Sequence, residues 1–219
     1  SRNQRDSQRL PNRHAYELDG PASGNAVVGN TITRNVQSGI FTSAIGVDII
    51  GNVIYSNSTG FAYDEIVIAG DNNNVYHNTI HGAKDDGISV EGANTTIRNN
   101  IITGSADDGI RVTGGSIALE SHNLIPDAIT GPANLGGQAT FTVDSTTINA
   151  DPLYVDAANG DFRLTSPNSP AINAGTFLVA PWIDRNGTDS GSFYGSAPDI
   201  GAFESAVGPT PDIVSGLTA

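Results

Sequence analysis

The chain has 219 residues, and its 10 Lys and Arg against 23 Asp and Glu give a formal net charge of −13 at pH 7. So acidic a body argues against binding to nucleic acid or to an anionic membrane, because phosphate groups repel it. The absence of cysteine excludes disulfides, zinc–thiolate sites and thiol nucleophiles, and without an apolar run of 18 residues we expect no membrane span.

Residues 1–19 form a basic N-terminal tail. They contain four of the ten basic residues and show no periodicity, which is typical of a disordered segment. Because an acidic body follows, we predict that the tail docks on an acidic surface of its own chain or of a neighbouring copy. A homo-oligomer or filament, formed through this tail and the open first coil, is therefore one hypothesis.

Residues 20–125 repeat with a period of about 22 residues. One series of asparagines is spaced by 22, 26, 22 and 23 residues: Asn30, Asn52, Asn78, Asn100 and Asn123. A second series is apolar: Ile40, Ile66, Ile88 and Ile110. The pattern predicts coils with two or three short strands, stacked at about 4.8 Å, whose apolar side chains point inward.

An asparagine at a fixed place in each coil has two physical explanations. Its amide can hydrogen-bond to the same amide one coil away, as in stacked asparagine ladders. Its backbone also tolerates the left-handed conformation of a sharp corner. We expect both explanations to apply to this series.

This repeat resembles the right-handed parallel β-helix superfamily, the pectate-lyase-like fold. The resemblance implies an all-β chain, a right-handed parallel β-helix (solenoid) of about five 22-residue coils with a C-terminal β cap. The handedness is implied by the resemblance alone. Polysaccharide would be the partner of such a protein.

The repeat also places acidic residues in columns. Asp64, Asp86 and Asp108 fall in one column, and Asp85 and Asp107 fall beside them. Stacked carboxylates repel one another and need a cation, a shared proton or full solvation. Three interpretations stay open: Asp–Gly turns on a solvated corner, a calcium site made by the first column, and a catalytic carboxylate pair.

For the catalytic interpretation, "KDDG" and "ADDG" resemble the paired-aspartate coil of polygalacturonase-like β-helix hydrolases. That resemblance implies that Asp85 and Asp86 act as acid and base on either side of a glycosidic bond, with Asp64 or Asp108 as a third carboxylate. The "Gly-His-Gly" coil and "Arg-Ile-Lys" strand of that family are missing.

A uronate lyase would instead need a cation and a basic residue that removes the C5 proton. Lys84, Arg111 and His81 are the candidates near the aspartates. Arg111 stands between two inward residues, so we expect it to point outward, in line with Ser89, and to be solvated. We expect His77 and His81 to lie on the surface.

Aromatic side chains that could stack on sugar rings are few. Tyr55, Tyr63 and Tyr76 are the candidate carbohydrate-binding residues, and Phe61 lies among them in the sequence.

After Asn123 the period stops. Residues 126–204 form a C-terminal loop and capping segment, and residues 205–219 are similar to a linker. The run "INADPLYVDAANGDFRLTSPNSPAINAG" with "APDIGAFE" resembles the C-terminal segment of secreted bacterial β-helix proteins of the choice-of-anchor type. This resemblance implies a secreted, extracellular or cell-surface location.

Within this segment, the open end of a solenoid needs a cap, since it exposes unpaired backbone groups. We therefore predict that "DFRL" and "DIGAFE" are short strands that finish the last coils. Asp184 and Asp199 are predicted turn residues, with bound calcium as the alternative.

The sequence leaves three functional hypotheses. The first is a secreted or cell-surface β-helix protein associated with polysaccharide, as the C-terminal part of a polysaccharide lyase or glycoside hydrolase. The alternative is a non-catalytic structural or adhesive module that stacks end to end into a surface fibre or filament. The third is a calcium-stabilised sugar-binding module without turnover.

Overall fold

The computed structural model describes residues 14–20, 24–126, 135–137, 143–164, 167–178, 193 and 195–205. The basic tail before residue 14, Asp184 and the chain after residue 205 lie outside these residues. The predictions made for them, including filament formation through the tail, stay predictions.

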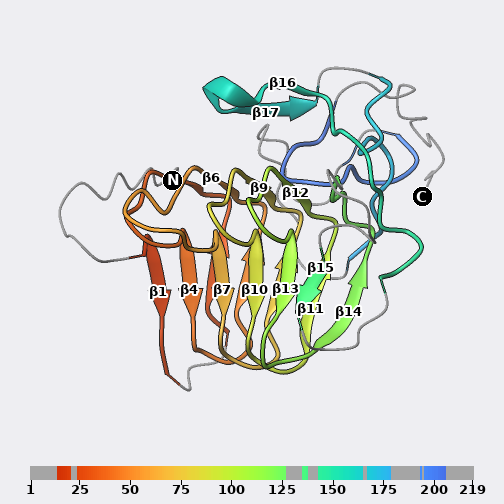
Figure 1. Ribbon diagram of the computed structural model, residues 1–219. Helices are drawn as coiled ribbons and strands as arrows, with labels where there is room; N and C mark the ends of the chain where they lie inside the picture. The colour runs from red at the N-terminus through yellow and green to blue at the C-terminus, as the bar shows by residue number, and fades with distance from the viewer. Residues whose placement is uncertain are drawn as a thin grey trace, which may run out of the picture.

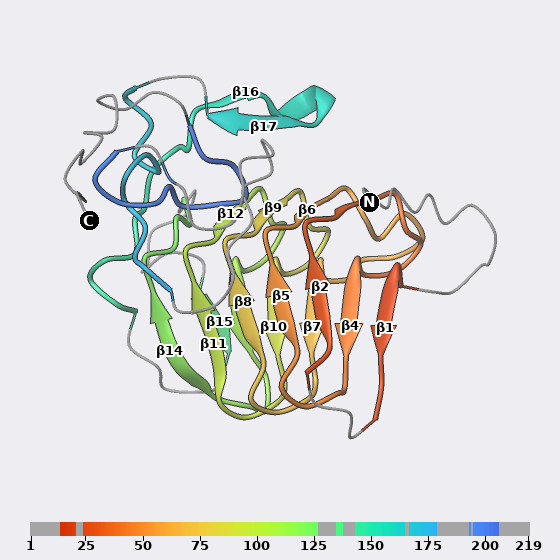
Figure 2. The same ribbon diagram turned by 180° about the vertical axis from the view of Figure 1, so that it is seen from behind.

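Short parallel strands wind into a solenoid with three sheets (Figures 1 and 2). The first sheet contains β1 (Tyr16–Leu18), β4 (Ile40–Thr42), β7 (Ile66–Ile68), β10 (Ile88–Val90), β13 (Ile110–Val112) and β15 (Leu135–Gly137). The second contains β2 (Ala26–Val28), β5 (Asp48–Ile50), β8 (Asn74–Tyr76), β11 (Thr95–Arg98) and β14 (Ile117–Ser121). The third contains β3 (Thr31–Thr33), β6 (Val53–Tyr55), β9 (Thr79–His81) and β12 (Ile101–Thr103). The described residues include no helix long and apolar enough to cross a membrane.

The apolar series is superposed from coil to coil, as the period predicts. Ile40 pairs with Ile66, Ile66 with Ile88 and Ile88 with Ile110 in parallel register. All four side chains are fully buried in the core, together with isoleucines of the other two sheets. Because each coil supplies one layer of this core, no coil can bury its apolar side chains without its neighbours.

The asparagine ladder is confirmed. Each Nδ2 donates to the Oδ1 of the next asparagine, at 3.1 Å from Asn30 to Asn52 and at 3.0 Å in the three steps from Asn52 to Asn123. Each Oδ1 from Asn52 onward also accepts the backbone N–H of the preceding ladder residue at 2.9 Å. The ladder therefore satisfies buried polar groups in every coil, which keeps the coils in register.

The second explanation for these asparagines is wrong. The left-handed backbone belongs to the residue immediately before each one, with φ between 51° and 65°: Gly29, Gly51, His77, Asn99 and His122. The corner therefore needs a preceding residue that tolerates positive φ, and the ladder asparagine is needed for its amide alone.

The C-terminal segment lies along the flank of the solenoid. β16 (Tyr154–Asp156), the 3₁₀ turn Ala157–Asn159 and β17 (Asp161–Leu164) form a small antiparallel unit beside β6, β9 and β12 (Figure 1). Phe162 is buried against Val53 and Tyr55. The prediction that "DFRL" finishes the last coils is therefore wrong, because among the described strands it pairs with β16 and with none of the solenoid.

Two features of this segment agree with the sequence. Ile148 adds a parallel bridge to Leu124, one coil beyond the last full repeat. Buried Asp199 accepts the backbone N–H of Asn173 and of Ser205, each at 2.7 Å, which is the role expected of a turn aspartate.

Candidate functional site

The first aspartate column is built by the turns that lead into the first sheet. Asp64, Asp86 and Asp108 each stand two residues before the first isoleucine of a strand. Asp64 Oδ1 accepts the backbone N–H of Asp86 at 3.0 Å, and Asp86 Oδ1 accepts that of Asp108 at 2.9 Å. The predicted superposition is confirmed, and the aspartates have a structural role in the turns.

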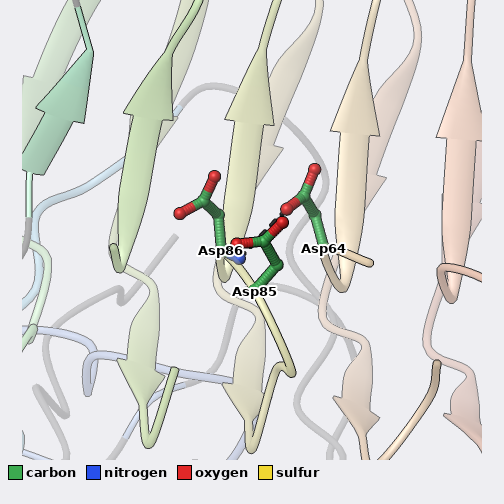
Figure 3. A group of neighbouring side chains, drawn as sticks. All are labelled: Asp64, Asp85 and Asp86. Carbon is green, nitrogen blue, oxygen red and sulfur yellow. Dashed lines mark hydrogen bonds between the residues drawn. The ribbon is translucent and has the colours of Figure 1, made fainter. Parts of the chain in front are cut away.

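The second column brings further carboxylates to the same place. Asp64, Asp85 and Asp86 form the first triad, in which the carboxylate oxygens lie within 4.8 Å of one another (Figure 3). Asp86, Asp107 and Asp108 form the second triad by the same criterion. Asp86 belongs to both triads and is buried, with 3 % of its surface exposed, so its charge is the most costly of the five.

Arg111 neutralises the second triad. It is in register with Ser89 and Val67 on the outer side of the sheet, as predicted. Its guanidinium lies 2.8 Å from Asp107, 3.8 Å from Asp86 and 3.9 Å from Asp108. The expectation that Arg111 is merely solvated is therefore wrong.

In the first triad, Arg111 reaches Asp86 alone. Among the described residues, no Lys, Arg or His nitrogen lies within 4.0 Å of a carboxylate oxygen of Asp64 or Asp85. Lys84, the candidate base next to Asp85, is exposed and makes no such pair. Two of the three carboxylates of the first triad, those of Asp64 and Asp85, thus lack an ion pair with the described chain.

The crowding changes proton affinity. Burial, together with the charges of Asp64 and Asp85, raises the pKa of Asp86 to about 7, although the Asp108 N–H and Arg111 act to lower it. Burial likewise raises the pKa of Asp64 to about 6 and, in direction, that of Asp108. Near neutral pH, the group therefore either shares protons or binds a cation.

The sequence reasoning missed Glu65. Its side chain is fully buried, and burial raises its pKa to about 7. Asn57 donates to both of its carboxylate oxygens, from the backbone N–H at 3.0 Å and from Nδ2 at 2.5 Å. The sequence did contain a signal for this residue, because the two neighbouring coils have glycine, Gly39 and Gly87, at the position where this coil has a glutamate.

The histidines lie elsewhere than expected. His77 is buried rather than on the surface, and burial lowers its pKa to about 3. His81 is partly buried, with its ring 5.2 Å from that of Phe162 and its Nδ1 2.7 Å from Thr103 Oγ1. Since His81 packs against the C-terminal segment, it is a poor candidate for a base acting at the aspartates.

The three candidate tyrosines belong to different parts of the solenoid. Tyr55, on β6, packs edge-on against Phe162 with ring centroids 5.0 Å apart. Tyr76, on β8, donates its hydroxyl to Asn74 Oδ1 at 2.9 Å. Tyr63 lies in the turn before β7, directly before Asp64. They form no single platform, and only Tyr63 adjoins the aspartate columns.

A family model described as "Right handed beta helix region" matches residues 64–166. This match agrees with the parallel β-solenoid that the described strands form. The β-helix match includes both carboxylate triads and part of the C-terminal segment. Among solved structures, the crystal structure of pectate lyase Pel9A is similar over 86% of this chain and 76% of that chain, at 15% identity and a TM-score of 0.30. Values this low say nothing about the activity of the β-helix, and a search of curated proteins found no match.

Proposed function

We propose that the protein is a secreted or cell-surface β-helix protein that associates with polysaccharide and binds calcium at its first triad. The observation that carries the proposal is the placement of Asp64, Asp85 and Asp86 within 4.8 Å of one another, with no basic group of the described chain within 4.0 Å of Asp64 or Asp85. Calcium prefers such oxygen ligands and takes six to eight of them, so positions stay open for water and for sugar oxygens.

Calcium would also explain how so acidic a chain associates with an acidic polysaccharide. A protein with a net charge of −13 repels uronate polymers unless a cation lies between the two. The β-helix fold and the resemblance of the C-terminal segment to secreted β-helix proteins support the location. Asp108, expected in the calcium site from the sequence, belongs instead to the triad that Arg111 neutralises.

Calcium at about 100 times its Kd is expected to raise the melting temperature by about 5–11 °C, because binding only the folded state stabilises it by about 2.7 kcal/mol. Differential scanning calorimetry with calcium or a chelator measures this. Asp64→Asn is expected to lose the shift. The matched control is Asp71→Asn, since Asp71 also accepts a backbone N–H 22 residues away, that of Ala93 at 2.8 Å, yet belongs to neither triad.

Equal melting temperatures with calcium and with the chelator would contradict the proposal. An equal loss of the shift in both variants would also do so, because it would show that the loss of any aspartate charge, and not of one in the triad, removes the shift.

The raised pKa of Asp86 favours a second candidate function, glycoside hydrolysis. A carboxyl with a pKa of about 7 can donate a proton at neutral pH, and Asp85, in the same triad, could act as the base. This assigns Asp86 as the general acid, with Asp85 as its partner.

Incubation with neutral and uronate polysaccharides, followed by assays for reducing ends and unsaturated products, tests this second function. Asp86→Asn is expected to lower the rate by about 100-fold or more, while Asp71→Asn keeps it. If the wild-type protein releases no product from any polymer, the catalytic candidate is rejected. Filaments seen by electron microscopy would then favour the structural alternative.

A further inference from the structure

One turn of the solenoid is longer than its counterparts. Nine positions separate Asn57 from Ile66, whereas five separate Asn35 from Ile40 and Ala83 from Ile88. The four extra residues lie in the turn between β6 and β7, which contains Phe61 and Tyr63 and then runs directly into Asp64 of the first triad.

Hydrogen bonds hold this longer turn in one conformation. At its base, Asn57 donates to both carboxylate oxygens of buried Glu65. Across the turn, Ser58 Oγ donates to the backbone oxygen of Tyr63 at 2.9 Å. The backbone N–H groups of Thr59 and Gly60 donate to the preceding coil at 3.0 and 3.2 Å. The turn is therefore a fixed platform.

This turn presents an aromatic pair to solvent. Phe61 is 72 % exposed, and its ring meets that of Tyr63 edge to face, with centroids 6.5 Å apart. The core gains little from a phenylalanine that is so exposed, so folding alone does not explain it. Single exposed aromatic residues are common on protein surfaces, but this one stands on a fixed, inserted turn that leads directly into the first triad, and that placement indicates a binding surface.

We propose that Phe61 and Tyr63 form a saccharide subsite that stacks on the apolar face of a pyranose ring. Asp64, the next residue, and Asp85, in the same triad, would accept hydrogen bonds from the ring hydroxyls. Two aromatic side chains offer at most about 500 Å², too little for the roughly 800 Å² that each partner of a stable protein complex buries. A sugar ring needs far less area, so the subsite fits a saccharide.

This inference rests on the proposed association with polysaccharide and not on calcium. Isothermal titration with neutral and uronate oligosaccharides, each with calcium and with a chelator, tests it. Phe61→Ala is expected to weaken binding about tenfold, as loss of an aromatic anchor does. The matched control is Phe177→Ala, because Phe177 is 64 % exposed and pairs edge to face with Phe193 at 5.2 Å.

The outcomes separate this subsite from the calcium proposal. Weaker saccharide binding by Phe61→Ala alone supports the subsite, even if calcium changes neither binding nor melting and the calcium proposal fails. Wild-type affinity in Phe61→Ala, or equal losses in Phe61→Ala and Phe177→Ala, would overturn the subsite. So would the absence of binding to every oligosaccharide tested. The melting temperatures of both variants are measured as well, and if they match that of the wild type, a loss of saccharide binding is not caused by a loss of folding.

Discussion

Replacing Asn78 by alanine is expected to lower the free energy of unfolding by about 4 kcal/mol or more. Asn78 is fully buried, and its Nδ2 donates to Asn100 Oδ1 at 3.0 Å and to the backbone oxygen of Ile49 at 2.9 Å. Its Oδ1 accepts both the backbone N–H and the Nδ2 of Asn52. Alanine leaves several buried polar groups unpaired, and each costs about 1–3 kcal/mol.

Urea unfolding followed by circular dichroism measures this loss. Asn94→Gly is the matched control, because Asn94 is exposed and donates to Asn72 Oδ1 at 3.3 Å in an exposed pair of the same kind. Glycine also tolerates the left-handed backbone at position 94, where φ is 60°. We expect this control to lose less than about 1 kcal/mol.

If Asn78→Ala does not fold, Asn30→Ala at the end of the ladder provides a graded test. Asn30 is only partly buried, and its carboxamide oxygen accepts the hydroxyl of Tyr16, so we expect a smaller loss there. Equal losses at Asn30, Asn78 and Asn94 would show that the ladder does not contribute through burial of its amides.

The sequence was sufficient to predict the solenoid and its columns, for a simple physical reason. Parallel strands superpose residues one period apart, so the spacings of the asparagines, isoleucines and aspartates predict which side chains are neighbours. The insertion between Asn57 and Ile66 did not hide this, because both series shift by the same four residues.

The period predicts neighbours but not the directions of side chains in turns. Glu65 turns into the interior to reach Asn57, and Arg111 folds back over the aspartates, although its backbone position was predicted. His77 is buried because residues far along the chain cover it, with backbone groups of Asp199 and Gly201 hydrogen-bonded to its ring. Such long-range packing leaves no periodic signal.

The contribution of the buried carboxyls Asp86 and Glu65 to the free energy of unfolding is expected to fall as the pH rises from about 4 to about 7, and then to level off. Asp86 and Glu65 have pKa values of about 7 in the folded protein, against ordinary values of 3.8 and 4.5. In this pH range, the folded chain holds protons that the unfolded chain has already released, so raising the pH favours unfolding.

The size of the fall follows from the same shifts. One pKa unit corresponds to about 1.4 kcal/mol, and after a reduction for coupling we expect a fall of roughly 4 kcal/mol. Asp64 adds less, because its carboxyl is partly exposed. Asp144 and Asp161 have lowered pKa values and act in the opposite direction, but they lie at the surface and contribute little. Buried His77 opposes the fall more strongly, because its pKa is lowered to about 3 and below about pH 6.5 the unfolded chain binds a proton there that the folded chain does not.

Urea unfolding at a series of pH values, in the presence of a chelator, measures this dependence. Glu65→Gln keeps an acceptor for Asn57 but cannot ionise, so its stability is expected to fall less steeply with pH than that of the wild type. Glu17→Gln is the control, because Glu17 is exposed on β1. Equal slopes in Glu65→Gln and the wild type would contradict the prediction, since they would mean that the Glu65 carboxyl does not hold its proton more tightly in the folded chain.

Calcium is expected to reverse the pH dependence of stability that the aspartates cause, but not the part that Glu65 causes. A calcium ion binds the ionised carboxylates, so it must displace the protons that Asp64 and Asp86 hold, with pKa values of about 6 and 7. Its stabilising effect is therefore expected to be small at pH 5 and large at pH 8. Asp64→Asn should lose this gain, while Glu65→Gln should retain it, because both oxygens of Glu65 are occupied by Asn57. Together, the two variants separate the buried carboxyl that fixes the turn from the carboxyls that face the proposed ion.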